Sequence, residues 1–134
     1  MAGTIAIISS TEIRRRELDR FLQEIGAVIT SDDVFDGYLS IKRGDIWVAI
    51  DNESPQFEGY RDLQTIRQKL GGEPRTNIVV EIGNAPESQR LAVEFACKFV
   101  ARWPSVVDDL VNKVYSSEEL LALCQLGGEF SYPA

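Results

Sequence analysis

The sequence predicts an α/β protein of the α+β-like kind: a single layered domain in which about four helices flank a mixed β-sheet with a central hairpin. Helical and strand-like patterns alternate along the chain, so the helices should pack in layers on the sheet. Two β-rich runs near the middle are joined by a glycine–aspartate turn, which requires an antiparallel pair. No linker, repeat or low-complexity stretch interrupts the 134 residues, so we expect residues 1–134 to form one domain.

The chain should open with a buried strand followed by a helix. Residues 5–8 form a short apolar run rich in β-branched side chains, which is typical of a buried strand. Ser9 and Glu12 have the spacing of a capping box, and the apolar residues after them keep helical spacing. Gly26 is the expected end of this helix, and residues 27–29 are a further strand candidate.

The predicted hairpin occupies the middle of the chain. Residues 38–41 and 46–50 are its two strands, and residues 42–45 connect them. Gly44 is expected either to have a positive φ in the turn or to stand where no side chain fits.

Three helices separated by strands are expected in the second half. Apolar residues recur at near-helical spacing over 60–70, and a strand follows over 77–82. Asn84 and Glu87 again have capping-box spacing, and the helix after them should end at Pro104.

Short strands and a final helix complete the predicted fold. Residues 106–107 and 111–115 are the strand candidates. Ser116 and Glu119 form a third capping box, which opens a helix that extends to Leu126.

The amino-acid composition excludes several classes of binding and catalytic site. The chain has 14 basic and 21 acidic residues, a net charge of -7, and no histidine. The acidic balance argues against a protein that neutralises phosphates, and we expect no direct binding to nucleic acid. The lack of histidine excludes serine–histidine, cysteine–histidine and most zinc chemistry. Paired carboxylates are the one catalytic possibility that remains, and our expectation is no enzyme, no cofactor and no metal.

Cysteine usage and hydropathy indicate the compartment. Cys97 and Cys124 lie within apolar helical patterns, so both are expected to be reduced and buried. No apolar run approaches the length of a membrane span, and no signal peptide is recognisable. A cytoplasmic location is the expectation.

Acidic residues are concentrated in two parts of the chain. Residues 30–60 carry seven acids and two bases, and residues 105–134 carry five acids and one base. Aromatic residues are interleaved with these acids, as in a surface that binds a basic protein. The alternative, that the aromatics are core residues and the acids confer solubility, stays open.

Two acidic patches are the candidate partner-binding sites. The first flanks the hairpin and the loop after it, with two aromatic anchors, and consists of Asp45, Asp51, Glu53, Phe57, Glu58 and Tyr60. We expect its acids to be exposed and close together. The rival patch consists of Asp108, Asp109, Glu118 and Glu119. Its first two residues lie beside a predicted strand end, where a Mg²⁺ site is the alternative to a simple turn.

Two stretches near the end of the chain, residues 102–110 (RWPSVVDDL) and 114–121 (VYSSEELL), carry a resemblance to a known group of proteins. They resemble the ends of bacterial immunity proteins from contact-dependent growth inhibition and related polymorphic toxin systems. The resemblance implies a cytoplasmic, non-catalytic protein that blocks the active site of a cognate toxin domain, often a basic nuclease. A non-catalytic adaptor of a larger assembly is the first alternative. A metalloenzyme built on Asp108 and Asp109 is the second.

Overall fold

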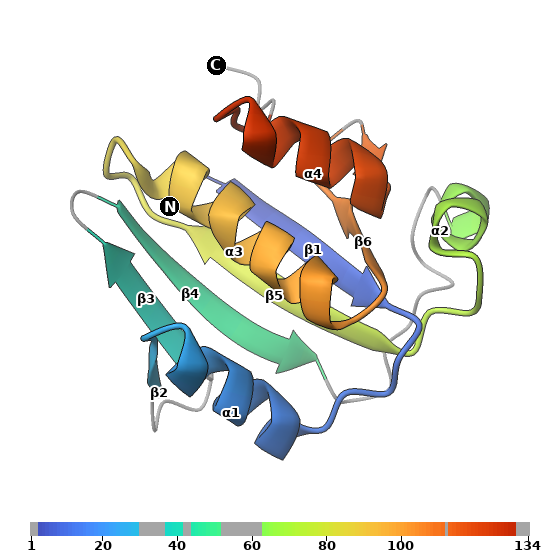
Figure 1. Cartoon of the computed structure of the whole chain (residues 1–134), viewed down its shortest axis with the longest axis horizontal. Coiled ribbons are helices and arrows are strands. Elements are labelled where there is room, and N and C mark those ends of the chain that lie inside the picture. The colour runs from blue at the N-terminus through green and yellow to red at the C-terminus, as the bar shows by residue number, and fades with distance from the viewer. Residues whose placement is uncertain (1–2, 30–36, 42–43, 52–62, 112, 131–134) are drawn as a thin grey trace.

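The computed structural model describes residues 3–29, 37–41, 44–51, 63–111 and 113–130 (Figure 1). The strands are β1 (Gly3–Ser9), β2 (Val28–Ile29), β3 (Gly37–Ile41), β4 (Gly44–Asp51), β5 (Thr76–Ile82), β6 (Ser105–Asp108) and β7 (Val114–Tyr115). The helices are α1 (Arg15–Glu24), α2 (Leu63–Leu70), α3 (Ser88–Arg102) and α4 (Ser117–Gln125).

Within these ranges the strands form one seven-stranded sheet in the order β2-β3-β4-β5-β1-β6-β7. Five strands have at least four residues, and the edge strands β2 and β7 have two residues each. The α+β class, the hairpin of β3 and β4, and the four helices confirm the prediction from the sequence. The chain crosses the sheet repeatedly in one domain, with its first strand, β1, between β5 and β6.

The sheet is antiparallel at every described pairing, so the expected mixed sheet is wrong. Strands that a helix connects do run in the same direction in two cases, β1 with β2 and β5 with β6. These strands are not neighbours, however. β1 pairs antiparallel with both β5 and β6, so it separates the two strands that α3 connects. The third such pair, β4 and β5 on either side of α2, is antiparallel and adjacent, so alternation along the chain determines neither strand direction nor which strands lie side by side.

The helices lie on both faces of the sheet. Ile5 and Ile7 point into a large core shared with α1, α3 and α4, and Figure 1 shows these three helices in front of the sheet. Ala6 and Ile8 point to the opposite face, where they pack with Ile66 of α2. Because both faces of β1 are covered, its residues form a continuous apolar run rather than an alternating one.

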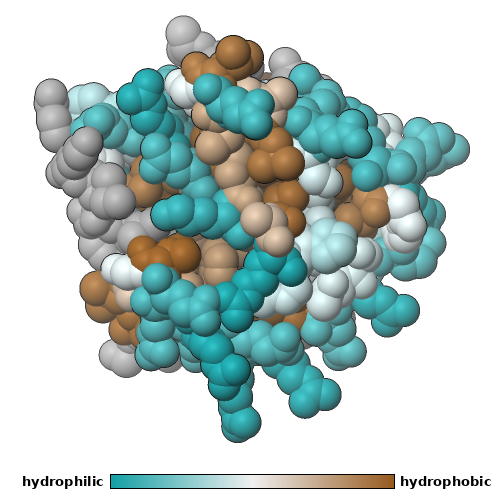
Figure 2. All heavy atoms as spheres, in the orientation of Figure 1, coloured by the Kyte–Doolittle hydropathy of each residue, from teal (hydrophilic) through white to brown (hydrophobic). Residues whose placement is uncertain are grey.

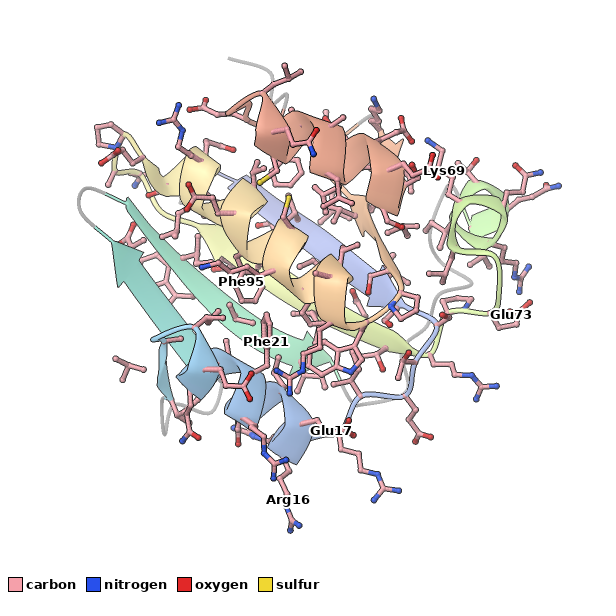
Figure 3. All side chains as sticks on the ribbon, in the orientation of Figure 1. Arg16, Glu17, Phe21, Lys69, Glu73 and Phe95 are labelled. Carbon is pink, nitrogen blue, oxygen red and sulfur yellow. The ribbon has the colours of Figure 1, made fainter. Side chains whose placement is uncertain are left out.

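Aromatic rings form the contact between α1 and α3. The Phe21 ring meets those of Phe95, Phe99 and Trp103 edge to face, with centroid distances of 5.8, 5.7 and 5.3 Å. Figure 3 shows Phe21 and Phe95 pointing toward each other between the two helices. Such pairs contribute about 0.5–1.5 kcal/mol each beyond the burial of their area.

Two of the three predicted capping boxes are displaced. Ser9 belongs to β1, where its hydroxyl donates to the Pro104 carbonyl at 2.7 Å, and α1 begins only at Arg15. The first turn of α1 is closed instead by Glu17, whose carboxylate accepts the Arg14 N–H. Helix α3 begins at Ser88 rather than directly after Asn84. The capping-box spacing therefore predicted that a helix follows in each case but not the residue at which the helix begins.

Gly44 confirms the second of the two roles expected for it. It does not have a positive φ, because it is the first residue of β4 and pairs with Ile41. A Cβ at this position would lie 2.7 Å from the carbonyl carbon of Glu87 and 2.9 Å from the Ser88 nitrogen. Only glycine therefore lets the hairpin lie against the start of α3.

Candidate protein-binding surface

Most residues of the first acidic patch lie outside the residues that the structure describes. Glu53, Phe57, Glu58 and Tyr60 are outside the described residues, and Asp51 is described by its backbone alone. Asp45 and Asp51 stand near opposite ends of β4, six residues apart. At the rise of a β-strand their Cα atoms are about 20 Å apart, so these two acids do not share one small patch. The expectation that they are close together is wrong.

Asp45 is half-buried and fastens the hairpin to α3, which corrects the expectation that it is an exposed charge. Its carboxylate oxygen Oδ1 accepts a hydrogen bond from the Ser88 hydroxyl at 3.1 Å, and its backbone N–H donates to the Ser88 Oγ at 3.0 Å. Its carbonyl accepts the Gly83 N–H at 3.0 Å. A Cβ at Gly83 would overlap the carboxylate, so the site is built around this side chain.

The second patch divides into buried and exposed residues. Asp108 is 9% exposed and Asp109 is fully buried. The Asp109 Oδ1 accepts the N–H groups of Val111 and Lys113 at 2.9 and 3.0 Å, and the Asp108 Oδ1 accepts that of Leu110 at 2.8 Å. These carboxylates organise the loop between β6 and β7, inside the fold rather than on a surface that a partner contacts.

Glu119 is bound to two lysines. Its Oε1 lies 2.7 Å from the Lys69 Nζ, and its Oε2 lies 3.3 Å from the Lys113 Nζ. It also accepts the Ser116 N–H, while the Ser116 hydroxyl accepts the Glu119 N–H, so the third capping box is confirmed. The bond from Lys69 and then the one from Ser116 lower the pKa of Glu119 to about 2. Figure 3 shows Lys69 extending from α2 toward α4.

The outward side of α4 has a different character. Its exposed residues recur at i, i+3, i+4, i+7 and i+8 and include two leucines; we call the set Glu118, Leu121, Ala122, Gln125 and Leu126 the α4 outer face. Leu121 is 43% exposed and Leu126 is 85% exposed. In Figure 2 hydrophobic and hydrophilic side chains are mixed in the region of this helix. The face brings together one residue from the predicted rival patch, Glu118, and apolar neighbours that the sequence reasoning missed.

A signal for this face exists in the sequence. Leu120 and Leu121 are adjacent, and adjacent residues on a helix diverge by about 100°, so one of them can face the core while the other faces outward. Leu120 is fully buried, and its carbonyl accepts the Cys97 thiol at 3.5 Å. Leu120 therefore faces the core, while Leu121 is exposed.

The cysteines confirm part of what was expected. Both thiols are free, and Cys97 is buried, but Cys124 is only partly buried. Burial is the main reason why the pKa of the Cys97 thiol rises to about 12. Cys124 lies in the last turn of α4, where it packs against the core with part of its surface exposed. The expectation of burial is therefore wrong for Cys124.

No protein-family model matches the sequence, and neither a curated protein nor a solved structure does. In the described part of the chain no helix is both long enough and apolar enough to cross a membrane. Among the same residues no group of three or more potential ligand side chains is placed to hold a metal ion.

Proposed function

We propose that this chain is a bacterial immunity protein, which binds a cognate toxin domain in the cytoplasm and neutralises it by covering its active site. One observation carries the proposal: the α4 outer face combines exposed leucines with the carboxylate of Glu118, which makes no ion pair with any described residue. The likeness of residues 102–110 and 114–121 to the ends of immunity proteins supports the same function. The protein would act by binding alone and would carry out no catalysis.

The apolar part of the surface supports a protein partner. Leucines scattered singly over a surface are ordinary, but both of these belong to the α4 outer face, Leu121 within α4 and Leu126 directly after its last residue. Burying such side chains in a complex supplies the hydrophobic free energy that stable association requires.

The charge supports a basic partner. The fold uses the carboxylates of Asp45, Asp109 and Glu119, but Glu118 and Glu129 are exposed and make no ion pair with any described residue. With a net charge of -7, the protein attracts basic surfaces over a distance. A basic nuclease is the toxin that fits best, because carboxylates of the inhibitor would lie where substrate phosphates bind.

The test uses the reading frame beside the gene for this protein. The C-terminal domain of the protein that this neighbouring reading frame encodes, the candidate toxin, is expressed in cells with and without the present chain. Growth that is restored only by co-expression, together with a complex that survives purification, is the expected result. Cell death in both cultures would contradict the proposal. A complex in which the toxin keeps its full activity would also contradict it, and would instead indicate an adaptor.

A further inference from the structure

Resting on the function proposed above, we infer that the α4 outer face is the docking surface for the toxin. The toxin surface that fits it presents apolar side chains flanked by lysines or arginines. The inference selects one side of the molecule, which the proposed function by itself does not.

The exposed residues of the other three helices differ in character from those of α4. The exposed residues of α1 are all charged or amide side chains, namely Arg15, Arg16, Glu17, Arg20, Gln23 and Glu24. Those of α2 are Gln64, Arg67, Gln68 and Lys69. On α3 they are Arg90, Glu94, Lys98, Ala101 and Arg102. Among the described helices, α4 is thus the one whose outward side carries leucines. Since that side contributes nothing to the core, folding alone does not explain them.

Helix α4 is also held rigidly in place. Glu119 ties its first turn to Lys69 and Lys113, and the Arg90 guanidinium donates to the Gly127 carbonyl just past its end. Leu120 is fully buried between these two ends. A surface that is fixed before binding loses little conformational entropy when a partner docks, which suits a tight inhibitor.

The charges around the face favour a basic partner over a second copy of this chain. Glu118 lies at the start of the face, and Glu129 follows its end. The nearby bases are already engaged: Lys69 and Lys113 bind Glu119, and Arg90 binds a carbonyl. Two copies of a chain with a net charge of -7 would bring like charges together, whereas a basic toxin would neutralise them.

The experiment compares matched surface variants of the whole chain in binding to the purified toxin domain. The double variant Leu121→Gln, Leu126→Gln removes both leucines of the face. Val28→Gln is the control, because Val28 is 63% exposed and lies on β2, at the opposite edge of the sheet from β7. We expect the double variant to bind about 10-fold more weakly or worse, and Val28→Gln to bind like the wild type. Equal melting temperatures will show that both variants are folded.

A second pair tests the charge. Glu118→Lys should slow association at low salt and flatten its salt dependence, and Glu12→Lys, an exposed acid ahead of α1, should change neither as much. A wild type that binds no toxin refutes the proposed function and, with it, this docking. A wild type that binds while the double variant binds equally well refutes the docking alone. A wild-type dimer that the double variant converts to a monomer would assign the face to a second copy instead.

Discussion

The Lys69 ammonium lies 2.7 Å from the Glu119 carboxylate, and this contact joins two helices that pack on opposite faces of the sheet. Helix α2 covers the face that Ala6 and Ile8 share, and α4 covers the other. The link runs around the edge strand β7, where the same ammonium donates to the Val114 carbonyl at 2.7 Å. One lysine thus holds together the edge that supports the α4 outer face.

The first prediction concerns this link and its pH dependence. Because the pKa of Glu119 in the fold, about 2, is below its ordinary value of 4.5, its ion pairs stabilise the fold fully well above pH 4.5. That contribution is lost as the pH falls toward 2. The side chain is 37% exposed, so solvent screens the pair, and Glu119→Gln should cost only about 0.5–1 kcal/mol at pH 7. Urea unfolding of the wild type and Glu119→Gln at pH 7 and pH 3 measures this cost. A difference in unfolding free energy between the two proteins that is no smaller at pH 3 than at pH 7 would contradict the prediction.

The second prediction concerns Gly44. A methyl group there would press on the backbone of Glu87 and Ser88, which cannot move without shifting the start of α3. Gly44→Ala should therefore destabilise the protein by about 1–3 kcal/mol, and Gly44→Val by more. Gly72→Ala is the control, because its nearest neighbour would be the Ser10 Cβ at an ordinary 3.7 Å. Equal thermal stability of Gly44→Ala and the wild type would show that the hairpin does not lie against α3.

The third prediction separates the roles of the acids in the second patch. Asp109→Ala leaves the N–H groups of Val111 and Lys113 without their acceptor and should cost about 2–3 kcal/mol. Glu118→Ala changes only an exposed side chain and should stay within about 0.5 kcal/mol of the wild type. Denaturant unfolding measures both. An Asp109→Ala protein that is as stable as the wild type but no longer protects cells would make Asp109 a contact residue.

The fourth prediction concerns thiol reactivity. Cys97 is buried, its Sγ donates to the Leu120 carbonyl, and burial raises its pKa to about 12. A maleimide should therefore label Cys124 first under native conditions and reach Cys97 only when the protein unfolds. Labelling followed by mass spectrometry of peptides resolves the two sites. In Cys124→Ser no fast labelling should remain, and a rapid phase in that variant would place Cys97 near the surface.

Local patterns predicted the elements of the fold well. The apolar run of β1 and the box formed by Ser116 and Glu119 are visible because each depends on residues close in sequence. Pairing is different: β1 meets residues 76–82 and 105–108, and no short pattern encodes contacts of that separation. The displaced cap at Ser9 has the same origin. Ser9 is used by a long-range bond to Pro104, which the local spacing could not reveal.

The candidate site was predictable only in part. Charge counts identified the acid-rich segments but could not tell a structural carboxylate from an available one. Asp109 and Glu118 look alike in sequence, yet one is fully buried and accepts backbone N–H groups while the other is exposed. Asp45 is a structural carboxylate like Asp109. Its hydrogen-bond partner Ser88 lies 43 residues away in the chain, so local sequence could not reveal this role. The adjacency of Leu120 and Leu121 allowed an outward leucine without requiring one, because adjacent residues can both be buried, as Phe21 and Leu22 are in α1.

The bond from Lys69 to the Val114 carbonyl also bears on how the protein behaves at high concentration. An edge strand offers backbone groups to which strands of other molecules can add, and such additions begin aggregation. Here one of those groups is already occupied by a lysine, which an incoming strand would have to displace together with its bond to Glu119. Addition of a further strand at β7 is thereby hindered, while α4 beside it stays accessible. This end of the molecule can therefore bind a partner through α4 without self-associating through the sheet edge.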